Sequence, residues 1–342
     1  MTGADPDFQR LLVVRRDNIG DLVCTTPLFT ALKHRFPAAR LDVLVNSYNA
    51  PILEGNPDLD RIHAYTKAKH LGERESKLAS YWGRVGQVMR LRRNRYDCVV
   101  LATPGWQPRM VRMARWLAPR HLLAFVPVAS TPRAVDLAVP YTAPQGLHHV
   151  EDVFRLARRL GIEGAPPPLT LRTSAPGPDP GAVTIGVHLS ARKPSQRWPE
   201  THFIASMQML ATIPRVRFRL FWAPGSEDDR RHPGDDQKAA RVVAAIAGIR
   251  VEAIETKTLA ALMAGLNGCD IAMMSDGGAM HVAAALGKPV VCFFGQSDAA
   301  YWHPWGVRYR LLQPASKEVG DISPAEAVTA LRSLAAEAAI PL

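Results

Sequence analysis

The sequence predicts an α/β protein made of two parallel-sheet domains, and three observations support this fold class. The chain has 342 residues, more than the roughly 100–150 residues of one ordinary domain. Short apolar runs rich in Val, Leu and Ile alternate with longer segments of helical period, as in parallel sheets with crossover helices. A proline-rich stretch divides this pattern into two similar halves. The apolar share of 47% excludes a disordered or fibrous chain.

The first half predicts alternating strands and helices. The expected strands are residues 11–14, 41–45, 97–102 and 121–126, all short and apolar. Residues 25–36 are expected to form a helix, because Leu28, Leu32 and Phe36 repeat every four residues and Pro37 follows. An apolar stripe over residues 149–160 predicts a second helix.

A stiff connector separates the halves, since residues 166–180 contain six prolines, too many for a helix or a central strand. After it, strands are expected at 183–189, 216–222, 250–254, 270–275 and 290–294. Helices are expected at 200–210, 238–247, 258–266, 279–286 and 323–338, the last with Ser323 and Pro324 as its start. The predicted domains are 1–165 and 183–322, joined by the linker 166–182 and followed by segment 323–342.

Positive charge is concentrated in one part of the chain. The net charge is +11, and residues 67–120 hold thirteen Lys and Arg against three acidic residues. Aromatic residues among these cations are few and no recognised nucleic-acid motif accompanies them, so no nucleic acid is expected as a partner. Arg90, Arg92 and Arg93 are candidates for contact with another anionic partner. The alternative is that they only solvate a helix face.

The sequence also predicts the compartment. Residues 1–9 lack the basic segment of a signal peptide, and no stretch approaches the roughly 20 apolar residues that cross a bilayer. The four cysteines, Cys24, Cys98, Cys269 and Cys292, are far apart and form no C-x-x-C pair. These features favour a reduced cytosolic protein without structural zinc.

The loop that follows the first expected strand contains Gly20 and Asp21. Such loops lie at the carboxyl edge of a parallel sheet, where ligands bind. Gly20 permits a tight turn, and Asp21 comes a few residues before the expected helix. A turn glycine beside a solvated acid is the alternative. No G-x-G-x-x-G motif is present, which disfavours an NAD enzyme.

A second candidate follows the strand that ends at Ser275. Asp276, Gly277 and Gly278 lead there into a helix of small residues that contains His281. Glycines let the backbone approach a phosphate, and the N–H groups and dipole of a helix start favour an anion. His281 can donate to the same anion. The alternative is an ordinary turn with a surface histidine.

Two further loops carry charge at expected strand ends. The loop after the first strand of the second half holds Lys193 and Arg197 near Ser190, a set suited to neutralising a leaving diphosphate. The loop after the next strand contains Glu227, whose carboxylate can bind a ribose diol. Solvated surface charge is the alternative for both loops.

Five segments in order resemble glycosyltransferase family 9, the bacterial heptosyltransferases that transfer a heptose from ADP-heptose to the inner core of lipopolysaccharide. They are LLVVRRDNIGDLVCTTPLFTALKHRFP, RYDCVVLA, HHVEDVFRLARRLGI, HLSARKPSQRWPE and SDGGAMHVAAALGKPVVCFFGQSD. The resemblance implies a GT-B fold, with two Rossmann-like lobes that face each other across a cleft. The acceptor is then expected in the first lobe and the nucleotide sugar in the second, with the final helix returning toward the first. An inverting enzyme without cofactor or metal is also implied.

The resemblance assigns roles residue by residue. Asp21 matches the acid regarded as the general base for the acceptor hydroxyl. Asp276, Gly278 and His281 match the motif for the diphosphate of the nucleotide sugar, and Glu227 matches the acid that holds the adenosine ribose.

Two positions depart from the family pattern. Gly277 stands where the family commonly has threonine, and offers only its backbone N–H. Gln196 stands where lysine is often found, two positions before the Trp-Pro pair, so Lys193 or Arg197 is expected to supply the charge. These departures affect the identity of the donor more than the fold.

The implied reaction is direct displacement. Asp21 takes the proton of an acceptor hydroxyl, and the leaving diphosphate is met by Ser190, Lys193 or Arg197, by His281 and by backbone N–H groups at 277–279. The expected partners are the nucleotide-sugar donor, an anionic lipid-linked glycan bound by the three arginines at 90–93, and the inner-membrane surface. The expected location is the cytoplasm, including the cytoplasmic face of that membrane.

Three alternatives stay open beside this interpretation, and the basic stretch 67–120 supports one of them, a nucleic-acid-binding protein. Another is a transferase of the same fold that uses a different nucleotide sugar or acceptor. The third is a non-catalytic relative that binds sugar nucleotides, for which Gly277 and Gln196 are the supporting departures.

Overall fold

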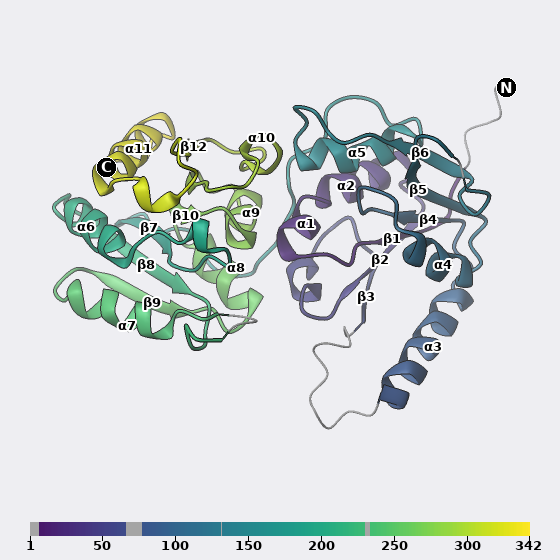
Figure 1. The fold of residues 1–342 in the computed structure, drawn as a ribbon, viewed down its shortest axis with the longest axis horizontal. Coiled ribbons are helices and arrows are strands. Elements are labelled where there is room, and N and C mark those ends of the chain that lie inside the picture. Colours follow the sequence, from purple (N-terminus) through teal and green to yellow (C-terminus); the bar gives the residue numbers. More distant parts are fainter. Residues whose placement is uncertain (1–6, 66–76, 131, 230–232) are drawn as a thin grey trace. The chain divides into compact units, whose positions relative to one another are not determined.

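The computed structural model describes residues 7–65, 77–130, 132–229 and 233–342, with the backbone alone at 77–84. The chain forms two compact units, Met1–Thr170 and Leu171–Leu342, and each contains a six-stranded sheet flanked by helices (Figure 1). The boundary after Thr170 lies inside the proline-rich stretch. No helix in the described ranges combines the length and apolarity needed to span a membrane.

The first unit has a parallel sheet in the order β3-β2-β1-β4-β5-β6. Its strands are β1 Arg10–Val14, β2 Arg40–Asn46, β3 Arg61–Tyr65, β4 Cys98–Leu101, β5 His121–Pro127 and β6 Leu137–Tyr141. The four expected strands are confirmed to within one residue at each end. The strands β3 and β6 are not predicted by the sequence pattern, because they lie at the two edges of the sheet and are largely half-buried.

Helices cover both faces of this sheet. They are α1 Ile19–Val23, α2 Thr26–Arg35, α3 Lys77–Arg93, α4 Pro108–Trp116 and α5 His149–Arg158. On one face α2 packs against α5. On the other, Leu91 of α3 and Val111 of α4 share a buried cluster with Leu12 and Val14 of β1. The sequence predicts α2 and α5 but not the five-residue helix α1, which changes the local setting of Asp21.

The second unit repeats this architecture. Its parallel sheet has the order β12-β11-β10-β7-β8-β9. The strands are β7 Val183–His188, β8 Val216–Trp222, β9 Val251–Glu255, β10 Ile271–Ser275, β11 Val290–Phe293 and β12 Tyr309–Leu312. All five expected strands are confirmed. The unexpected strand β12 is again a half-buried edge.

The helices of the second unit are α6 Glu200–Ala211, α7 Asp236–Ala245, α8 Leu259–Asn267, α9 Gly278–Ala285, α10 Ala299–Trp302 and α11 Pro324–Glu337. The helix α11 packs against α6, β11 and β12, and it buries Leu331 and Leu334 in the main core of this unit. The segment 323–342 therefore belongs to the second unit itself. The return of this helix toward the first lobe, which the resemblance implies, stays a prediction.

Both sheets have the Rossmann strand order. If the strands of each unit are numbered along the chain, the order in space is 3-2-1-4-5-6 in both. The direction of strand succession reverses between β1 and β4 in the first unit, and between β7 and β10 in the second. Ligands of such sheets bind beyond the carboxyl ends of the strands at this reversal. The fold thus indicates where each unit holds its candidate site.

Candidate active site

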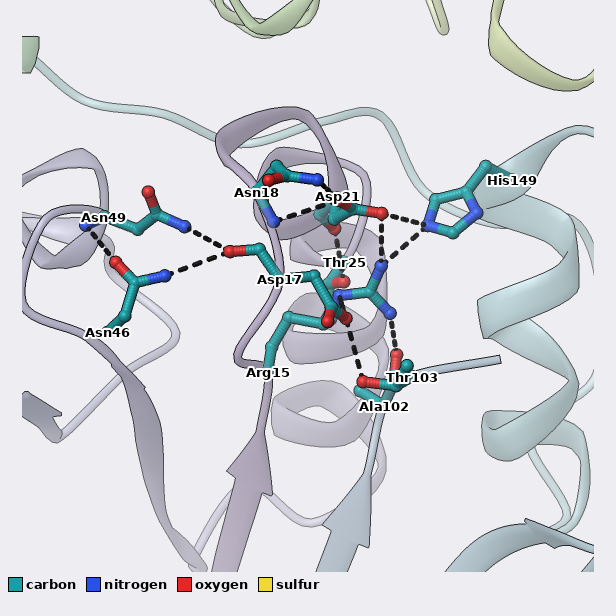
Figure 2. A network of polar contacts seen from close by, with 10 residues as sticks. All are labelled: Arg15, Asp17, Asn18, Asp21, Thr25, Asn46, Asn49, Ala102, Thr103 and His149. Atoms are coloured by element: carbon teal, nitrogen blue, oxygen red, sulfur yellow. Dashed lines mark hydrogen bonds and ion pairs between the residues drawn. The ribbon is translucent and has the colours of Figure 1, made fainter. Parts of the chain in front are cut away.

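Asp21 lies at the strand-order reversal of the first unit, in the third position of the short helix α1 (Figure 2). Its Oδ2 accepts hydrogen bonds from the backbone N–H of Asn18 at 3.0 Å and from the Asn18 amide at 3.1 Å. Its Oδ1 accepts from Nη2 of Arg15 at 2.9 Å. The carboxylate is thus oriented on both sides, and at 15% exposure it can still be reached by a substrate hydroxyl.

Arg15 links Asp21 to two other segments around the same point, as Figure 2 shows. The side chain is 1% exposed, and its guanidinium lies 2.9 Å from Nε2 of His149 on α5 and donates to the carbonyl oxygen of Ala102 after β4. Nε2 of His149 is also 3.6 Å from Oδ1 of Asp21. Because a guanidinium can only donate, Nε2 of His149 accepts the bond and the ring proton resides on Nδ1.

Asp17 is a second carboxylate on the same guanidinium, which sequence reasoning did not single out. Its Oδ2 lies 3.3 Å from Nε of Arg15 and accepts from the hydroxyl of Thr103 at 2.9 Å. Its carbonyl oxygen accepts from the amides of Asn46 and Asn49 at 3.0 and 2.9 Å. A charged loop directly after β1 is the sequence signal for Asp17. Nothing local marks His149, which is 134 residues from Arg15.

In the second unit, Gln196 joins three loops at the carboxyl edge of the sheet. Its Nε2 donates to Oδ2 of Asp276 at 2.5 Å and to Oγ of Ser297 at 2.8 Å. These residues follow β7, β10 and β11, which are neighbours in the sheet. The position at which the family often has lysine therefore holds a buried neutral amide that contacts Asp276.

The start of α9 is open. Gly277 caps the helix, is exposed and has an extended backbone, and a Cβ on it would meet no atom within 4 Å. Packing therefore does not require glycine here. Gly278 begins the helix, so residues 277–279 form its first turn, and the binding of an anion by their N–H groups stays a prediction.

Lys238 joins the two ends of the basic loop 189–198, which follows β7 and carries Lys193 and Arg197. Its Nζ donates to the carbonyl oxygens of Leu189 and Trp198, both at 3.1 Å, and these two residues flank the loop. Burial lowers the pKa of the Lys238 ammonium, although the Asp235 carboxylate acts in the opposite direction. On the other side of the loop, a Cβ at Gly295 would lie 2.3 Å from the Ser195 carbonyl oxygen, so only glycine permits this approach.

Ser190 and Glu227 are engaged with protein groups. The Oγ of Ser190 accepts from the backbone N–H of Ala223 at 2.8 Å and is hydrogen-bonded to Asp235, which joins the loops after β7 and β8. Glu227 forms an ion pair with Arg241 at 2.9 Å. Both side chains have a positioning role in addition to any contact with a ligand.

Lys193 and Arg197 remain exposed on the same loop. Nε of Arg197 donates to the carbonyl oxygen of Ala191 at 3.2 Å, which leaves its terminal nitrogens free to contact a ligand. With the exposed Arg192, these two side chains are the cations of the loop that can meet a diphosphate.

His281 lies inside α9 and is 2% exposed, with its ring centroid 5.8 Å from that of Trp302. Burial lowers the pKa of this imidazole to about 4, although the Asp276 carboxylate acts in the opposite direction. The ring is neutral at pH 7. It can therefore offer an N–H to an anion but no positive charge.

We expect His281 to make folding stability depend on pH. Its pKa is about 4 when folded and 6.5 when unfolded, so between these values the unfolded chain binds more protons. Stability is then full above pH 6.5 and falls as the pH is lowered toward 4. Urea unfolding of the second unit, measured from pH 7 to 4, is expected to show a weaker pH dependence for His281→Gln than for wild type.

The exposed His34 provides the control for this measurement. His34→Gln is expected to keep the wild-type pH dependence of the unfolding free energy. Equal slopes for wild type and His281→Gln would contradict the assignment of a neutral buried imidazole.

The three candidate arginines of α3 are all exposed, but they have different surroundings. Nη1 of Arg92 donates to the carbonyl oxygen of Trp116 at 3.1 Å. Arg90 lines a hollow beside β3, and Arg93 is not among the residues that line it. The earlier cations of the basic stretch, Lys67, Lys69 and Arg74, lie outside the described residues.

Comparison with known proteins decides the family. The model of "Glycosyltransferase family 9 (heptosyltransferase)" matches residues 86–323, well over half of the chain. This chain belongs to glycosyltransferase family 9. The family assignment and the class of enzyme, a glycosyltransferase, are therefore confirmed.

Curated relatives of this family 9 glycosyltransferase match over most of their length. Lipopolysaccharide heptosyltransferase 3 of Escherichia coli is 24% identical over 302 residues, which cover 84% of this chain and 83% of the relative. Lipopolysaccharide heptosyltransferase 1 of Escherichia coli O18:K1:H7 is 21% identical over 335 residues, which cover 92% and 94%.

Solved structures show that the family 9 chain has the GT-B fold. The family 9 glycosyltransferase of Veillonella parvula superposes with a TM-score of 0.79 at 17% identity, covering 97% of this chain and 99% of that one. Escherichia coli heptosyltransferase WaaC with ADP-2-deoxy-2-fluoro heptose gives 0.75 at 20% identity, covering 95% and 99%. The predicted fold class is confirmed, and the roles of individual residues stay predictions.

Proposed function

We propose that this glycosyltransferase moves a heptose from ADP-heptose to a lipopolysaccharide core or a related anionic glycan, with inversion at the anomeric carbon. The relatives named as lipopolysaccharide heptosyltransferases support the sugar and the acceptor class. A structural neighbour that holds an ADP-heptose analogue supports the donor. The observation that carries the proposal is the Asp21 carboxylate, oriented by Arg15 and Asn18 where the strand order reverses.

Asp21 is the general base of the proposed reaction. Its Oδ1 accepts the proton of an acceptor hydroxyl while the oxygen of that hydroxyl attacks the anomeric carbon. The new glycosidic bond forms as the bond between the anomeric carbon and the diphosphate oxygen breaks. The proton ends on Asp21 and the negative charge on the departing ADP.

Groups of the second unit stabilise that departing charge in the proposal. Lys193 and Arg197 supply positive charge, and the N–H groups of 277–279 supply hydrogen bonds. His281 contributes at most a neutral N–H, and Glu227 binds the ribose beside Arg241. The nucleotide sugar is a substrate, and we propose that no further cofactor or metal takes part.

An anionic membrane surface is the proposed partner that presents the acceptor. The segments of α3 and α4 contain no Asp or Glu, and five of the arginines whose side chains the structure describes there are exposed: Arg90, Arg92, Arg93, Arg109 and Arg112. The side chain of Trp116 at the end of α4 is 64% exposed, and that of Met89 is 53% exposed. Arginines attract anionic headgroups and an exposed tryptophan suits the membrane interface.

A panel of ADP-, UDP-, GDP- and dTDP-sugars tests the donor. We expect ADP-heptose to raise the melting temperature most, because a ligand that binds only the folded state stabilises it. Heptosylated product, detected by mass spectrometry with a lipopolysaccharide-core acceptor, is expected with this donor alone. Product from another sugar would assign a different donor. Stabilisation by ADP-heptose without turnover would favour the non-catalytic alternative.

A further inference from the structure

A hollow of about 330 Å³ lies beside the edge strand of the first sheet, apart from the Asp21 network. It is lined by residues 61–64 of β3 and by Gln87, Arg90 and Asn94 of α3 and its end. Nε2 of Gln87 donates to the carbonyl oxygen of Ala64 at 2.7 Å, which joins the helix to the free edge of the strand. The walls of the hollow thus combine arginines, side-chain amides and backbone groups.

Arg61 and Arg90 give this hollow its charge. Both side chains are exposed, and no acidic residue lines the hollow within the described ranges. Neither arginine forms an ion pair with a described side chain, whereas Arg40, Arg115 and Arg155 of the same unit do. Two cations that share a hollow without a protein counter-charge favour an anion between them.

A buried network holds the wall of the hollow in place. Asp42 is fully buried, and its Oδ2 accepts from the Tyr96 hydroxyl at 2.7 Å and lies 3.2 Å from Nε2 of His63. Nδ2 of Asn94 donates to the Tyr96 hydroxyl at 3.0 Å. Two lining residues, His63 and Asn94, are therefore fixed before any ligand arrives.

The charge of Asp42 does not cancel that of the hollow. Burial acts to raise the pKa of this carboxyl, but hydrogen bonds from His63 and Tyr96 and the charge of Arg40 lower it overall. The carboxylate is ionised, and its charge is balanced by Arg40, whose Nη2 lies 3.1 Å from Oδ2. The field of Arg61 and Arg90 therefore remains for a ligand.

The strand register relates the hollow to the Asp21 network. In the strand register Arg61 pairs with Asp42 and Tyr65 pairs with Asn46, whose amide contacts the Asp17 carbonyl oxygen. Four residues along a strand span about 13 Å. An oligosaccharide that places a hydroxyl at Asp21 must therefore extend over more than one sugar residue to place an acidic group in the hollow.

We propose that this hollow binds the phosphate or carboxylate group of an anionic acceptor glycan between Arg61 and Arg90. The inference rests on the proposed function for the identity of the acceptor, but not for the presence of an anion site. Arg61 lies outside the basic stretch 67–120 of the sequence. In the hollow it lies together with Arg90, one of the three candidate arginines at 90–93. The site selects acceptors that carry an acidic group at a set distance from the reacting hydroxyl.

Protection of the arginines from phenylglyoxal tests the site on the wild-type protein without an activity assay. Peptide mass spectrometry is expected to show that glucose 6-phosphate or glucuronate slows modification of Arg61 and Arg90, with less effect on Arg93 on the same helix. Protection by inorganic phosphate alone, or by phosphatidylglycerol vesicles alone, would overturn the proposal, since it would indicate an adventitious ion or a lipid headgroup. Equal protection of Arg93 would also overturn it.

Acceptor kinetics give the second test. Arg61→Gln and Arg90→Gln are each expected to raise the KM of a phosphorylated acceptor roughly tenfold, the loss of one charge-assisted contact, and to leave kcat unchanged. A dephosphorylated acceptor is expected to show no such difference. Arg158→Gln, an exposed arginine in the last turn of α5, is the control and is expected to behave as wild type.

The kinetic outcomes separate this site from the proposed function. Transfer by every variant with an unchanged KM for the phosphorylated acceptor would overturn the site and leave the function standing. An absence of transfer in wild type, with protection of Arg61 and Arg90 still measured, would overturn the function and leave the anion site standing.

Discussion

Asp21→Asn is expected to lower kcat by roughly 10²–10⁴-fold, the usual contribution of a general base. The amide keeps the size of the carboxylate and can still accept from Nη2 of Arg15, which lies 2.9 Å from Oδ1 in the wild type. It cannot take the acceptor proton. Steady-state kinetics with saturating donor and acceptor measure this effect, and the KM of the donor is expected to stay within a few-fold of wild type because donor binding is proposed for the other unit.

Asp17→Asn is the comparison for Asp21→Asn. Asp17 contacts the same guanidinium and its side chain is 35% exposed, but its carboxylate oxygen accepts from Thr103. We expect the kcat of Asp17→Asn to fall less than tenfold below that of wild type. If Asp21→Asn retained turnover within tenfold of wild type, the general base would have to be sought elsewhere, and Asp17 would be the next residue to test.

Arg15→Met is expected to reduce both stability and turnover. The guanidinium is 1% exposed and balances Asp21 and Asp17, so its removal leaves two carboxylates without their cation. Removing one partner of a buried ion pair lowers the free energy of unfolding by about 3–5 kcal/mol. Because both carboxylates are partly exposed, the expected loss here is about 3 kcal/mol. Turnover is expected to fall as well, because Asp21 loses the contact that orients Oδ1. Urea unfolding and kcat provide the two readouts.

Arg16→Met is the matched control, since it removes the same charge from the next residue. Arg16 stacks on the ring of Tyr65 with its guanidinium carbon 4.1 Å from the centroid and is only partly buried. Loss of such a cation–π contact is expected to lower the free energy of unfolding by about 1 kcal/mol or less. If Arg15→Met unfolded with the same free energy as Arg16→Met, the guanidinium would not hold the network together.

A second variant of Arg15 separates the effect of its charge from the effect of its geometry. Arg15→Lys keeps one positive charge but cannot reach Asp21, His149 and the Ala102 carbonyl oxygen together, because an ammonium lacks the planar fork of a guanidinium. We expect it to recover much of the stability lost in Arg15→Met and less of the turnover. Full recovery of kcat would show that charge alone orients Asp21.

Local sequence patterns predicted the central strands and one edge strand, β9, and missed the other three edge strands. The strand β1 is a buried apolar run after its first residue, and β8 alternates buried apolar residues with half-buried ones, so their patterns identify them directly. The edge strands β3, β6 and β12 carry Arg, His or Tyr on half-buried positions, so their pattern does not differ from that of a loop. Propensity and periodicity report burial, and edge strands are the least buried part of a sheet.

Local sequence patterns also predicted some features of the candidate sites and missed others. The sequence placed Asp21 and Asp276 at strand ends, because a loop after a parallel strand always lies at the carboxyl edge. It did not predict that Gln196 bonds to Asp276 or that Ser190 accepts from the backbone N–H of Ala223, as the structure shows. Side-chain partners from other loops decide this difference, and no local pattern contains them.

The sequence by itself determined the alternation of strands and helices, the two-unit division, the family and the loops that carry charge at strand ends. These properties depend on neighbours along the chain. The tertiary structure decided which of those charges meet, because the strand order 3-2-1-4-5-6 brings β4 beside β1 and α5 within reach of Arg15. It also separated Arg90 from Arg92 and Arg93 and paired it with Arg61, since contacts between distant segments depend on strand order and not on local periodicity.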